Sequence, residues 1–326
     1  MSLLQRRAVR LGATLVVTGL AALYIVSKIS IGKTAHIIGD ASPWWLLLSL
    51  FLTVVTVPPQ AWRWQRLLEV RGIHEPLSWL TRAYFVSYAV GQVLPTSVGG
   101  DASRIFETTR RHPGQGSPVA GSVLLERALG GAVTLVLAAV GLVLAIGRYS
   151  IGAYLWIEAL FVVLTIFAGV VLFSRRARRV LRFAVPFLTR IRADRPIRAA
   201  YEGIHGYRAH VRTLLVVACV TTCAQLSRIF AIWASSEAVG IHLSVRPFVV
   251  LGPLLFLVML VPFTVNGLGV REAFFISFLG QLHVSHDPAF ATGFLFFVMT
   301  IVLALPGLAV ILWEGLRRTR VSMSNA

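Results

Sequence analysis

Several continuous apolar runs, each long enough to cross a bilayer as one helix, constrain the fold of this chain most. One example is the run at 214–235, and a spanning helix needs about 20 apolar residues. Inside lipid every backbone polar group must be paired within the protein, which restricts the fold to helices or a closed barrel. The runs are continuous and not alternating, so a barrel is disfavoured. A mean hydropathy of +0.77 with 13% charged residues is too apolar for a soluble domain. We therefore expect an all-α, polytopic membrane helical bundle.

A ten-residue pattern occurs twice, each time inside an apolar stretch. The copies are Pro95-Thr-Ser-Val-Gly-Gly-Asp-Ala-Ser-Arg104 and Pro262-Phe-Thr-Val-Asn-Gly-Leu-Gly-Val-Arg271, and Pro, Val, Gly and Arg match at equal spacing. Proline and glycine interrupt a helix. Paired interruptions of this kind in the two halves of a membrane protein indicate a transporter site.

Arginine-rich loops set the expected orientation, because basic loops stay in the cytoplasm. Both termini and the basic segment 175–212 are therefore expected in the cytoplasm, and 31–43 and 237–246 outside. A cleaved signal peptide is the alternative for the first apolar run. We expect 175–212 to be an interfacial segment on anionic lipid, with a purely topology-setting loop as the alternative. The predicted spans are 11–30, 44–64, 122–146, 153–173, 214–235 and 289–313.

Two further apolar segments do not fit this alternation of sides. The first, 77–103, has basic residues on both flanks, and the second, 247–282, must begin and end outside. Each is predicted to enter the membrane and return as a re-entrant hairpin broken at its motif. Three predicted spans separate the two motifs, and an odd number of crossings inverts one relative to the other. The sequence thus predicts an inverted repeat.

Ionisable residues at membrane depth are the candidates for substrate binding, because burying a charge there is costly. Arginine forks and helix N-termini after the breaks both favour a phosphate-bearing headgroup. The alternative is that acidic and basic members pair only to neutralise charge. The candidates are Asp101, Arg104, Glu126, Arg127, Arg228, Arg271 and Glu272. The residues expected to shape the two breaks are Pro95, Gly99, Gly100, Pro262, Asn266, Gly267 and Gly269.

Several functional classes have no support in the sequence. A net charge of +18 would suggest nucleic acid in a soluble protein, but here the arginines lie in short loops between spans. His283, His286 and Asp287 have ligand-like spacing, yet no second cluster accompanies them. We expect no metal and no cofactor. No nucleotide-binding or hydrolase motif is present.

Four sequence elements resemble the lysylphosphatidylglycerol synthase transmembrane-region family, whose members are also called flippase-like membrane proteins. The resemblance covers nearly the whole chain, and Arg228 lies outside its pattern. It implies a protein that moves lipid across the bilayer. In the best-known members a cytosolic aminoacyl-transferase domain follows, whereas this chain stops at Ala326, so the resemblance implies a stand-alone member. The elements are Trp64-Gln-Arg-Leu-Leu68, Val93-Leu-Pro-Thr-Ser-Val-Gly-Gly-Asp-Ala-Ser-Arg104, Leu125-Glu-Arg-Ala-Leu-Gly130 and Asn266-Gly-Leu-Gly-Val-Arg-Glu272.

The sequence favours one domain over 1–326 that translocates an anionic or phosphate-linked lipid, either a phospholipid or a polyprenyl-phosphate-linked one, in the cell membrane. The alternative is a membrane-embedded enzyme or accessory subunit acting on a lipid-linked saccharide in envelope biogenesis, with Asp101 and Glu126 as its acidic pair. A scaffold for another envelope protein is the third interpretation. The expected partners are membrane lipid and a homo-oligomer or an envelope-biosynthesis protein, without nucleic acid.

Overall fold

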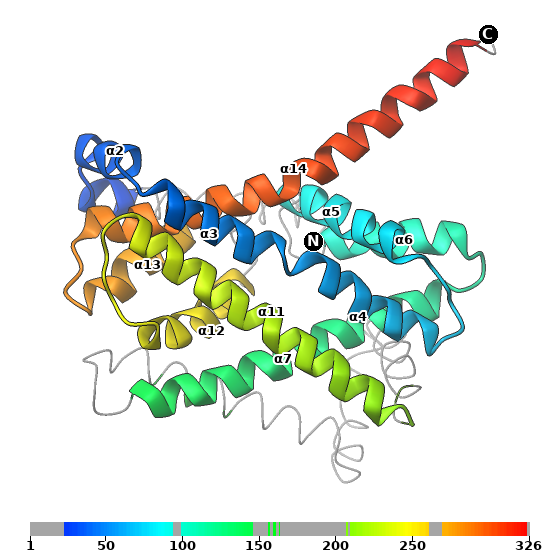
Figure 1. Cartoon of the computed structure of the whole chain (residues 1–326), viewed down its shortest axis with the longest axis horizontal. Coiled ribbons are helices and arrows are strands. Elements are labelled where there is room, and N and C mark those ends of the chain that lie inside the picture. Colours follow the sequence, from blue (N-terminus) through cyan, green and yellow to red (C-terminus); the bar gives the residue numbers. More distant parts are fainter. Residues whose placement is uncertain are drawn as a thin grey trace, which may run out of the picture.

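The computed structural model describes residues 23–93, 99–145, 156, 159, 160, 163, 207, 209–260 and 269–324. Every regular element in these ranges is an α-helix (Figure 1). This confirms the predicted all-α class. The helices are α2 (Ile31–Gly39), α3 (Pro43–Val54), α4 (Val57–Glu69), α5 (Leu77–Val93), α6 (Gly99–Arg111), α7 (Gly116–Ala145), α11 (Val211–Ala238), α12 (Arg246–Leu260), α13 (Val270–Gly280) and α14 (His286–Ser324).

Four stretches of the described chain are long and apolar enough to cross a membrane: Pro43–Val70, Gly116–Leu144, Val211–Ala238 and His286–Glu314. They contain most of the predicted spans 44–64, 122–146, 214–235 and 289–313, so the polytopic bundle is confirmed. Most of 11–30 and 153–173 lies outside the described residues.

The first of these stretches is interrupted where α3 gives way to α4. Pro58 and Pro59 occupy the first turn of α4. An N–H at this position would have no acceptor within α4, so proline is tolerated there, but without an N–H it cannot continue the backbone hydrogen bonds of α3. The backbone hydrogen-bond ladder is therefore interrupted between α3 and α4, although Val55 and Thr56 keep right-handed helical dihedral angles.

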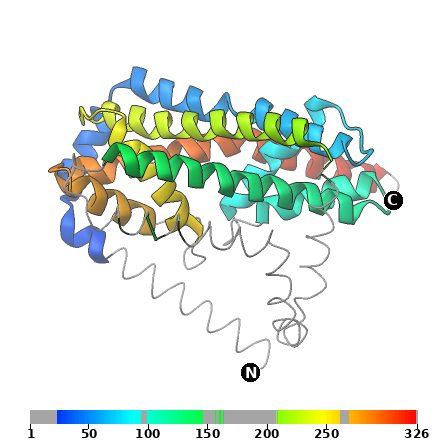
Figure 2. The ribbon, with the colours of Figure 1, turned by 90° about the horizontal axis from the view of Figure 1, so that it is seen from below.

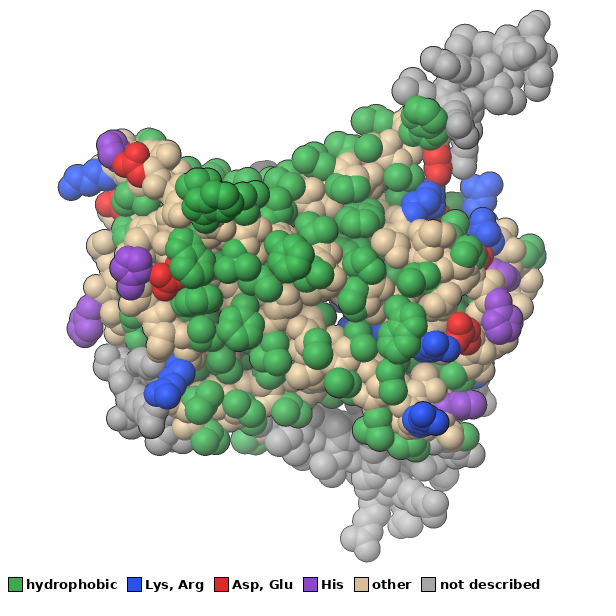
Figure 3. Space-filling model, in the orientation of Figure 1, with side chains coloured by type: hydrophobic (Ala, Val, Ile, Leu, Met, Phe, Trp, Pro, Cys, Tyr) green, Lys and Arg blue, Asp and Glu red, His purple; other side chains and the backbone are tan. Residues whose placement is uncertain are grey.

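The surface of the bundle is apolar around its middle and polar at its two ends. The long helices lie side by side, with their connections at two ends (Figure 2). Large apolar side chains such as Phe51, Val136, Leu215 and Leu305 are exposed on its surface. Apolar side chains cover the middle of one face, and charged ones gather toward both ends (Figure 3). This distribution is the one expected of a protein surrounded by hydrocarbon.

The predicted outer loop 31–43 contains a helix that the sequence did not suggest. α2 begins after Ser30, whose backbone N–H donates to Oδ1 of Asp287 at 2.7 Å. The hydroxyl of Thr34 donates to the same oxygen at 3.0 Å. A carboxylate supplied by α14 thus accepts from one free backbone N–H and one hydroxyl at the start of α2. Asp287 has structural partners here, and within the described residues it belongs to no group of three side chains that could hold a metal ion.

Both segments predicted as hairpins consist of two short helices around the repeated motif. In the first, α5 and α6 pack so closely that a Cβ on Gly100 would overlap the carbonyl of Ser87. The second limb runs on to Arg111, beyond the predicted end at 103. In the second, Gly269 has a φ of 82° and caps α13, a conformation that favours glycine. The two pairs occupy opposite halves of the bundle (Figure 1). Their re-entry into the membrane stays a prediction, and Pro95, Pro262, Asn266 and Gly267 lie outside the described residues.

Each helix pair packs against a long helix through a glycine. A Cβ on Gly307 of α14 would overlap the Phe85 carbonyl of α5, and one on Gly141 of α7 would lie 2.9 Å from the Val249 carbonyl oxygen of α12. Side chains larger than hydrogen would separate the backbones at both crossings. These contacts fix α5 and α12 on either side of the bundle interior.

Most of the predicted basic segment 175–212 lies outside the described residues, which include Tyr207 and the residues from 209 onward. The Tyr207 side chain is buried and donates from its hydroxyl to the Leu67 carbonyl at 2.9 Å. Burial raises the pKa of this hydroxyl to about 12, against the opposite effect of Arg71. The segment therefore ends against the last turn of α4.

Candidate functional site

A cluster of charged side chains, here called the Glu126 cluster, joins four helices. Glu126 of α7 accepts through Oε1 from Nε of Arg63 at 3.1 Å, and also from Nη2 of Arg63 and the hydroxyl of Tyr84. Its Oε2 accepts from Nη1 of Arg104 at 3.1 Å. Arg63 lies on α4, Tyr84 on α5 and Arg104 on α6. One buried carboxylate thus links guanidinium groups from two different helices.

The cluster continues through Asp101 of α6. Nη2 of Arg104 donates to Oδ1 of Asp101 at 2.6 Å, and Nε of Arg127 donates to Oδ2. Asp101 and Arg104 are three residues apart and therefore share one face of α6. Three arginines and two carboxylates leave the cluster with one excess positive charge. Nε of Arg104 is buried and has no acceptor among the described residues.

Aromatic rings cover the cluster from the side of α4 and α5. The guanidinium carbon of Arg104 lies 4.2 Å from the ring centre of Tyr84 and 4.7 Å from that of Trp64. Nη1 of Arg63 donates to the Thr221 hydroxyl of α11 at 2.7 Å. Cation–π contacts and these hydrogen bonds compensate desolvation of the two guanidinium groups. The Glu126 cluster therefore connects α4, α5, α6 and α7 with one another, and one hydrogen bond joins it to α11.

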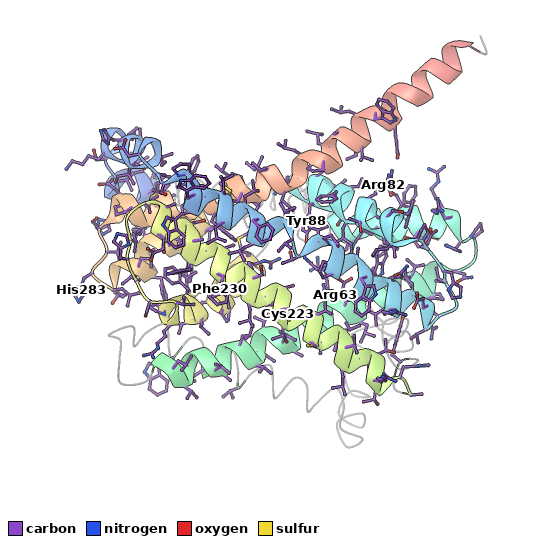
Figure 4. All side chains as sticks on the ribbon, in the orientation of Figure 1. Arg63, Arg82, Tyr88, Cys223, Phe230 and His283 are labelled. Carbon is purple, nitrogen blue, oxygen red and sulfur yellow. The ribbon has the colours of Figure 1, made fainter. Side chains whose placement is uncertain are left out.

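Arg63 is the member that the sequence interpretation missed. It lies at the end of the predicted span 44–64, where arginine is typical of a cytoplasmic flank, but its side chain is buried. The usable signal was its helical position. Gln60, Trp64 and Leu67 lie on the buried side of α4 with it, whereas Arg66 lies on the exposed side and pairs with Glu69. Figure 4 shows Arg63 directed from α4 into the bundle.

A second charged pair begins α13. Nε and Nη2 of Arg271 donate to Oε1 of Glu272 at 2.9 and 2.6 Å. Oε2 of Glu272 accepts from the Gly269 backbone N–H at 2.7 Å. The guanidinium carbon of Arg271 lies 4.3 Å from the ring centre of Phe297. Both charged side chains are buried. The backbone at the start of α13 orients the Glu272 carboxylate, and this carboxylate in turn orients the Arg271 guanidinium.

A cavity of about 270 Å³ lies between the two helix pairs. Its walls come from α3, α5, α7, α11, α12, α13 and α14, and from Thr56 between α3 and α4. Arg228 and Arg271 line it, together with the phenol of Tyr88 and several amide and hydroxyl side chains. Figure 4 shows Tyr88 in the interior beside α3 and α4, far from His283 at the end of the bundle. No carboxylate is among the lining residues that the structure describes.

The predicted site residues therefore fall into two groups. Asp101, Arg104, Glu126 and Arg127 belong to the Glu126 cluster and do not line this cavity. Arg228 and Arg271 line it, with Glu272 bonded to Arg271. The acidic–basic pairing that the sequence left open as an alternative is present in both groups. Within the described part of the chain, no three His, Cys, Asp or Glu side chains lie where they could hold a metal ion.

The polar wall of the cavity consists of bonded side chains. Gln225 donates from Nε2 to the Thr134 hydroxyl at 3.0 Å. The hydroxyl of Tyr88 donates to Oε1 of Gln60 at 3.2 Å, and Gln92 donates from Nε2 to the Thr300 carbonyl at 3.1 Å. These groups come from five helices and give an interior that suits a polar ligand with an apolar remainder.

Comparison with known families decides the relationship. Residues 11–307 match the family described as "Lysylphosphatidylglycerol synthase TM region". The chain belongs to this family. The matched region contains the Glu126 cluster, the Arg271–Glu272 pair and every residue that lines the cavity. No curated protein matches the chain. This member of the lysylphosphatidylglycerol synthase TM-region family is thus a multi-pass integral membrane protein that acts in membrane lipid biology.

Proposed function

We propose that the protein translocates an anionic or phosphate-linked lipid between the leaflets of the cell membrane. The central cavity carries this proposal, because two guanidinium groups line it, no carboxylate lies among its described lining residues, and it sits between two interrupted helix pairs. Sites at interrupted helices near the middle of the bilayer are typical of transporters. Membership of a lipid-related family supports lipid as the cargo.

Helix packing supports the inverted repeat that we propose for this protein. In this repeat α3–α4 corresponds to α11, α5 to α12, α6 to α13 and α7 to α14. When each helix is replaced by its counterpart, the major helix–helix contacts of one half become contacts that are also present in the other half. The packing of α5 on α14 becomes that of α12 on α7, and the packing of α6 on α7 becomes that of α13 on α14. The contact of α4 with α5 becomes that of α11 with α12. Exchanged helices such as α7 and α14 run in opposite directions (Figure 1).

A repeat of this kind explains why the cavity is central. Its walls include equivalent positions from both halves: Tyr88 and Gln92 precede the first motif at the same spacing at which Leu255 and Met259 precede the second. Rocking one half against the other would expose such a cavity alternately to each side. We propose that Asp101, Arg104, Glu126 and Arg127 hold the first helix pair in place during this movement, while Arg228, Arg271 and Glu272 contact the headgroup.

The proposed topology places both termini, the α4–α5 turn and the α6–α7 turn in the cytoplasm, and the α11–α12 loop outside, because arginine is concentrated at the first set of connections. Cysteines at Ser117 and His242, both exposed, test this in a background without Cys219 and Cys223. A membrane-impermeant maleimide applied to intact cells should label His242→Cys only. Labelling of Ser117→Cys alone would contradict the orientation.

The structure disfavours the enzyme alternative. An acidic pair that works on a lipid-linked saccharide needs at least one carboxylate free to exchange a proton or attack. Asp101 is bonded to Arg104 and Arg127, and Glu126 to Arg63 and Arg104. Carboxylates held by arginine in this way neutralise charge and position helices.

Vesicles containing the purified protein and fluorescent phosphatidylglycerol test the proposal. Dithionite added outside bleaches only the outer leaflet unless lipid crosses. With wild-type protein the inner-leaflet fluorescence should be lost as well, and protein-free vesicles should keep it. With Arg271→Ala the inner-leaflet lipid should stay protected from dithionite. With Arg271→Lys only part of the transfer activity should remain, because lysine cannot make the two parallel hydrogen bonds of a guanidinium. Protection equal to that of protein-free vesicles in the presence of folded wild-type protein would refute translocation of this lipid.

A further inference from the structure

Arg228 is an arginine at mid-membrane depth without a described acidic partner. It lies ten residues before Ala238, the last residue of α11, and at ~1.5 Å per residue that is about 15 Å from the helix end. Half of a bilayer core of about 30 Å is the same distance. The buried arginines Arg63, Arg104 and Arg271 all have carboxylate partners, whereas the structure records no hydrogen bond or ion pair for Arg228 with any described residue.

An arginine in the middle of a spanning helix costs roughly 2.5–3.5 kcal/mol on insertion scales. The side chain of Arg228 is exposed and lines the central cavity, so the charge faces the cavity instead of a protein partner. Its neighbours one turn away on the same helix, Gln225 and Ile232, line the cavity too. A compensating negative charge can therefore come from a molecule that enters this space.

Arg271 brings a second guanidinium to the same cavity in a fixed position. Its Nε and Nη2 are bonded to Glu272, which leaves Nη1 without an acceptor among the described residues. Glu272 is itself held by the Gly269 backbone. The side chain is thus oriented before any ligand arrives, which reduces the entropy lost on binding.

We propose that Arg228 and Arg271 bind one phosphodiester or phosphomonoester group in this cavity, and that the site selects a lipid headgroup with net negative charge. The choice of lipid rests on the proposed function. Arg228, Arg271 and Glu272 sum to one positive charge, which a phosphodiester monoanion neutralises. Guanidinium groups match phosphate oxygens in pairs. A headgroup that adds lysyl amines to its phosphate carries net positive charge and meets two guanidinium groups with no carboxylate among the described lining residues.

The size of the cavity is consistent with a headgroup alone. Its volume of about 270 Å³ is just below the range of roughly 300–1,000 Å³ typical of drug-sized ligands. Acyl chains must therefore remain outside it, against the apolar surfaces of the surrounding helices. Leu52, Ile229 and Phe296 line the cavity as well and suit the glycerol or first methylene groups.

Binding to the full chain in neutral phosphatidylcholine nanodiscs tests the proposal. The probes are short-chain phosphatidylglycerol, lysyl-phosphatidylglycerol and inorganic phosphate, each measured by titration calorimetry. The variants are Arg228→Gln and Arg228→Lys. Arg212→Gln is the matched control, because Arg212 is an exposed arginine on the same helix that does not line the cavity. Thermal melting of each variant shows that it is folded.

We expect wild-type protein to bind phosphatidylglycerol more tightly than its lysyl derivative. Losing a charged hydrogen-bond partner should weaken this binding roughly 10- to 100-fold in Arg228→Gln, with Arg228→Lys in between and Arg212→Gln like wild type. If only inorganic phosphate binds, and binds through Arg228, the anion site is supported. Its ligand is then a soluble phosphate and not a lipid headgroup. Equal binding of the lysyl lipid, or unchanged binding in Arg228→Gln, would overturn the proposal. Lipid transfer in vesicles is measured separately, so transfer without this binding leaves the translocase function standing.

Discussion

Replacing Glu126 by glutamine should destabilise the protein more than any other single change of charge in the described helices. The carboxylate holds Arg63 and Arg104 through three hydrogen bonds and also accepts from Tyr84. Removing it leaves the buried guanidinium of Arg63 without a carboxylate among the described residues and that of Arg104 with Asp101 alone, and breaking a buried ion pair from one side costs about 3–5 kcal/mol. We expect a lower melting temperature in detergent and poor recovery of folded protein.

A matched control comes from the exposed pair between Arg66 and Glu69 on α4, joined at 3.0 Å. Glu69→Gln should change stability by only about 0–1 kcal/mol, since surface ion pairs are weak. Adding Arg63→Met to Glu126→Gln should recover part of the lost stability, because one unpaired buried charge disappears. If Glu126→Gln and Glu69→Gln have the same melting temperature, the Glu126 cluster does not stabilise the contacts between its helices.

Much of the fold follows from the sequence because each long apolar run has only one way to satisfy its backbone in lipid. α7, α11 and α14 each match a predicted span for this reason. The two short helix pairs follow from the conflict between apolar length and basic flanks. Contacts between residues that are far apart in the sequence leave no such pattern in it. α2 depends on Asp287, which lies more than 250 residues away, and nothing in residues 31–43 alone identifies it.

The site was predicted in part for a similar reason. A charge within an apolar run is visible in a sequence, so Arg104, Glu126, Arg228 and Arg271 could be named. Their grouping depends on which helices are neighbours. Glu126 meets Arg104 because α6 packs on α7, and Arg228 meets the cavity of Arg271 because α11 and α13 both face the interior. Arg63 lies near the end of a predicted span, where arginine is typical of a cytoplasmic flank, and the packing of α4 against α5, α7 and α11 buries it.

Filling the cavity should stop lipid transfer while leaving the fold intact. Thr300 of α14 is partly buried and lines the cavity, whereas its neighbour Ile301 is exposed at the surface. Thr300→Trp places an indole in the space that we assign to the headgroup. Ile301→Trp adds the same side chain to the same helix one residue later, on the face that contacts lipid. Both variants should melt near wild type, because neither replaces a closely packed or charged side chain.

The most direct test of the proposed translocation is therefore dithionite accessibility of fluorescent phosphatidylglycerol in vesicles that contain wild-type, Thr300→Trp or Ile301→Trp protein. We expect wild type and Ile301→Trp to expose the inner-leaflet lipid to dithionite, and Thr300→Trp to protect it to the level of protein-free vesicles. Transfer by Thr300→Trp at the wild-type rate would contradict a path through the central cavity, and absence of transfer by folded wild-type protein would contradict translocation of this lipid altogether.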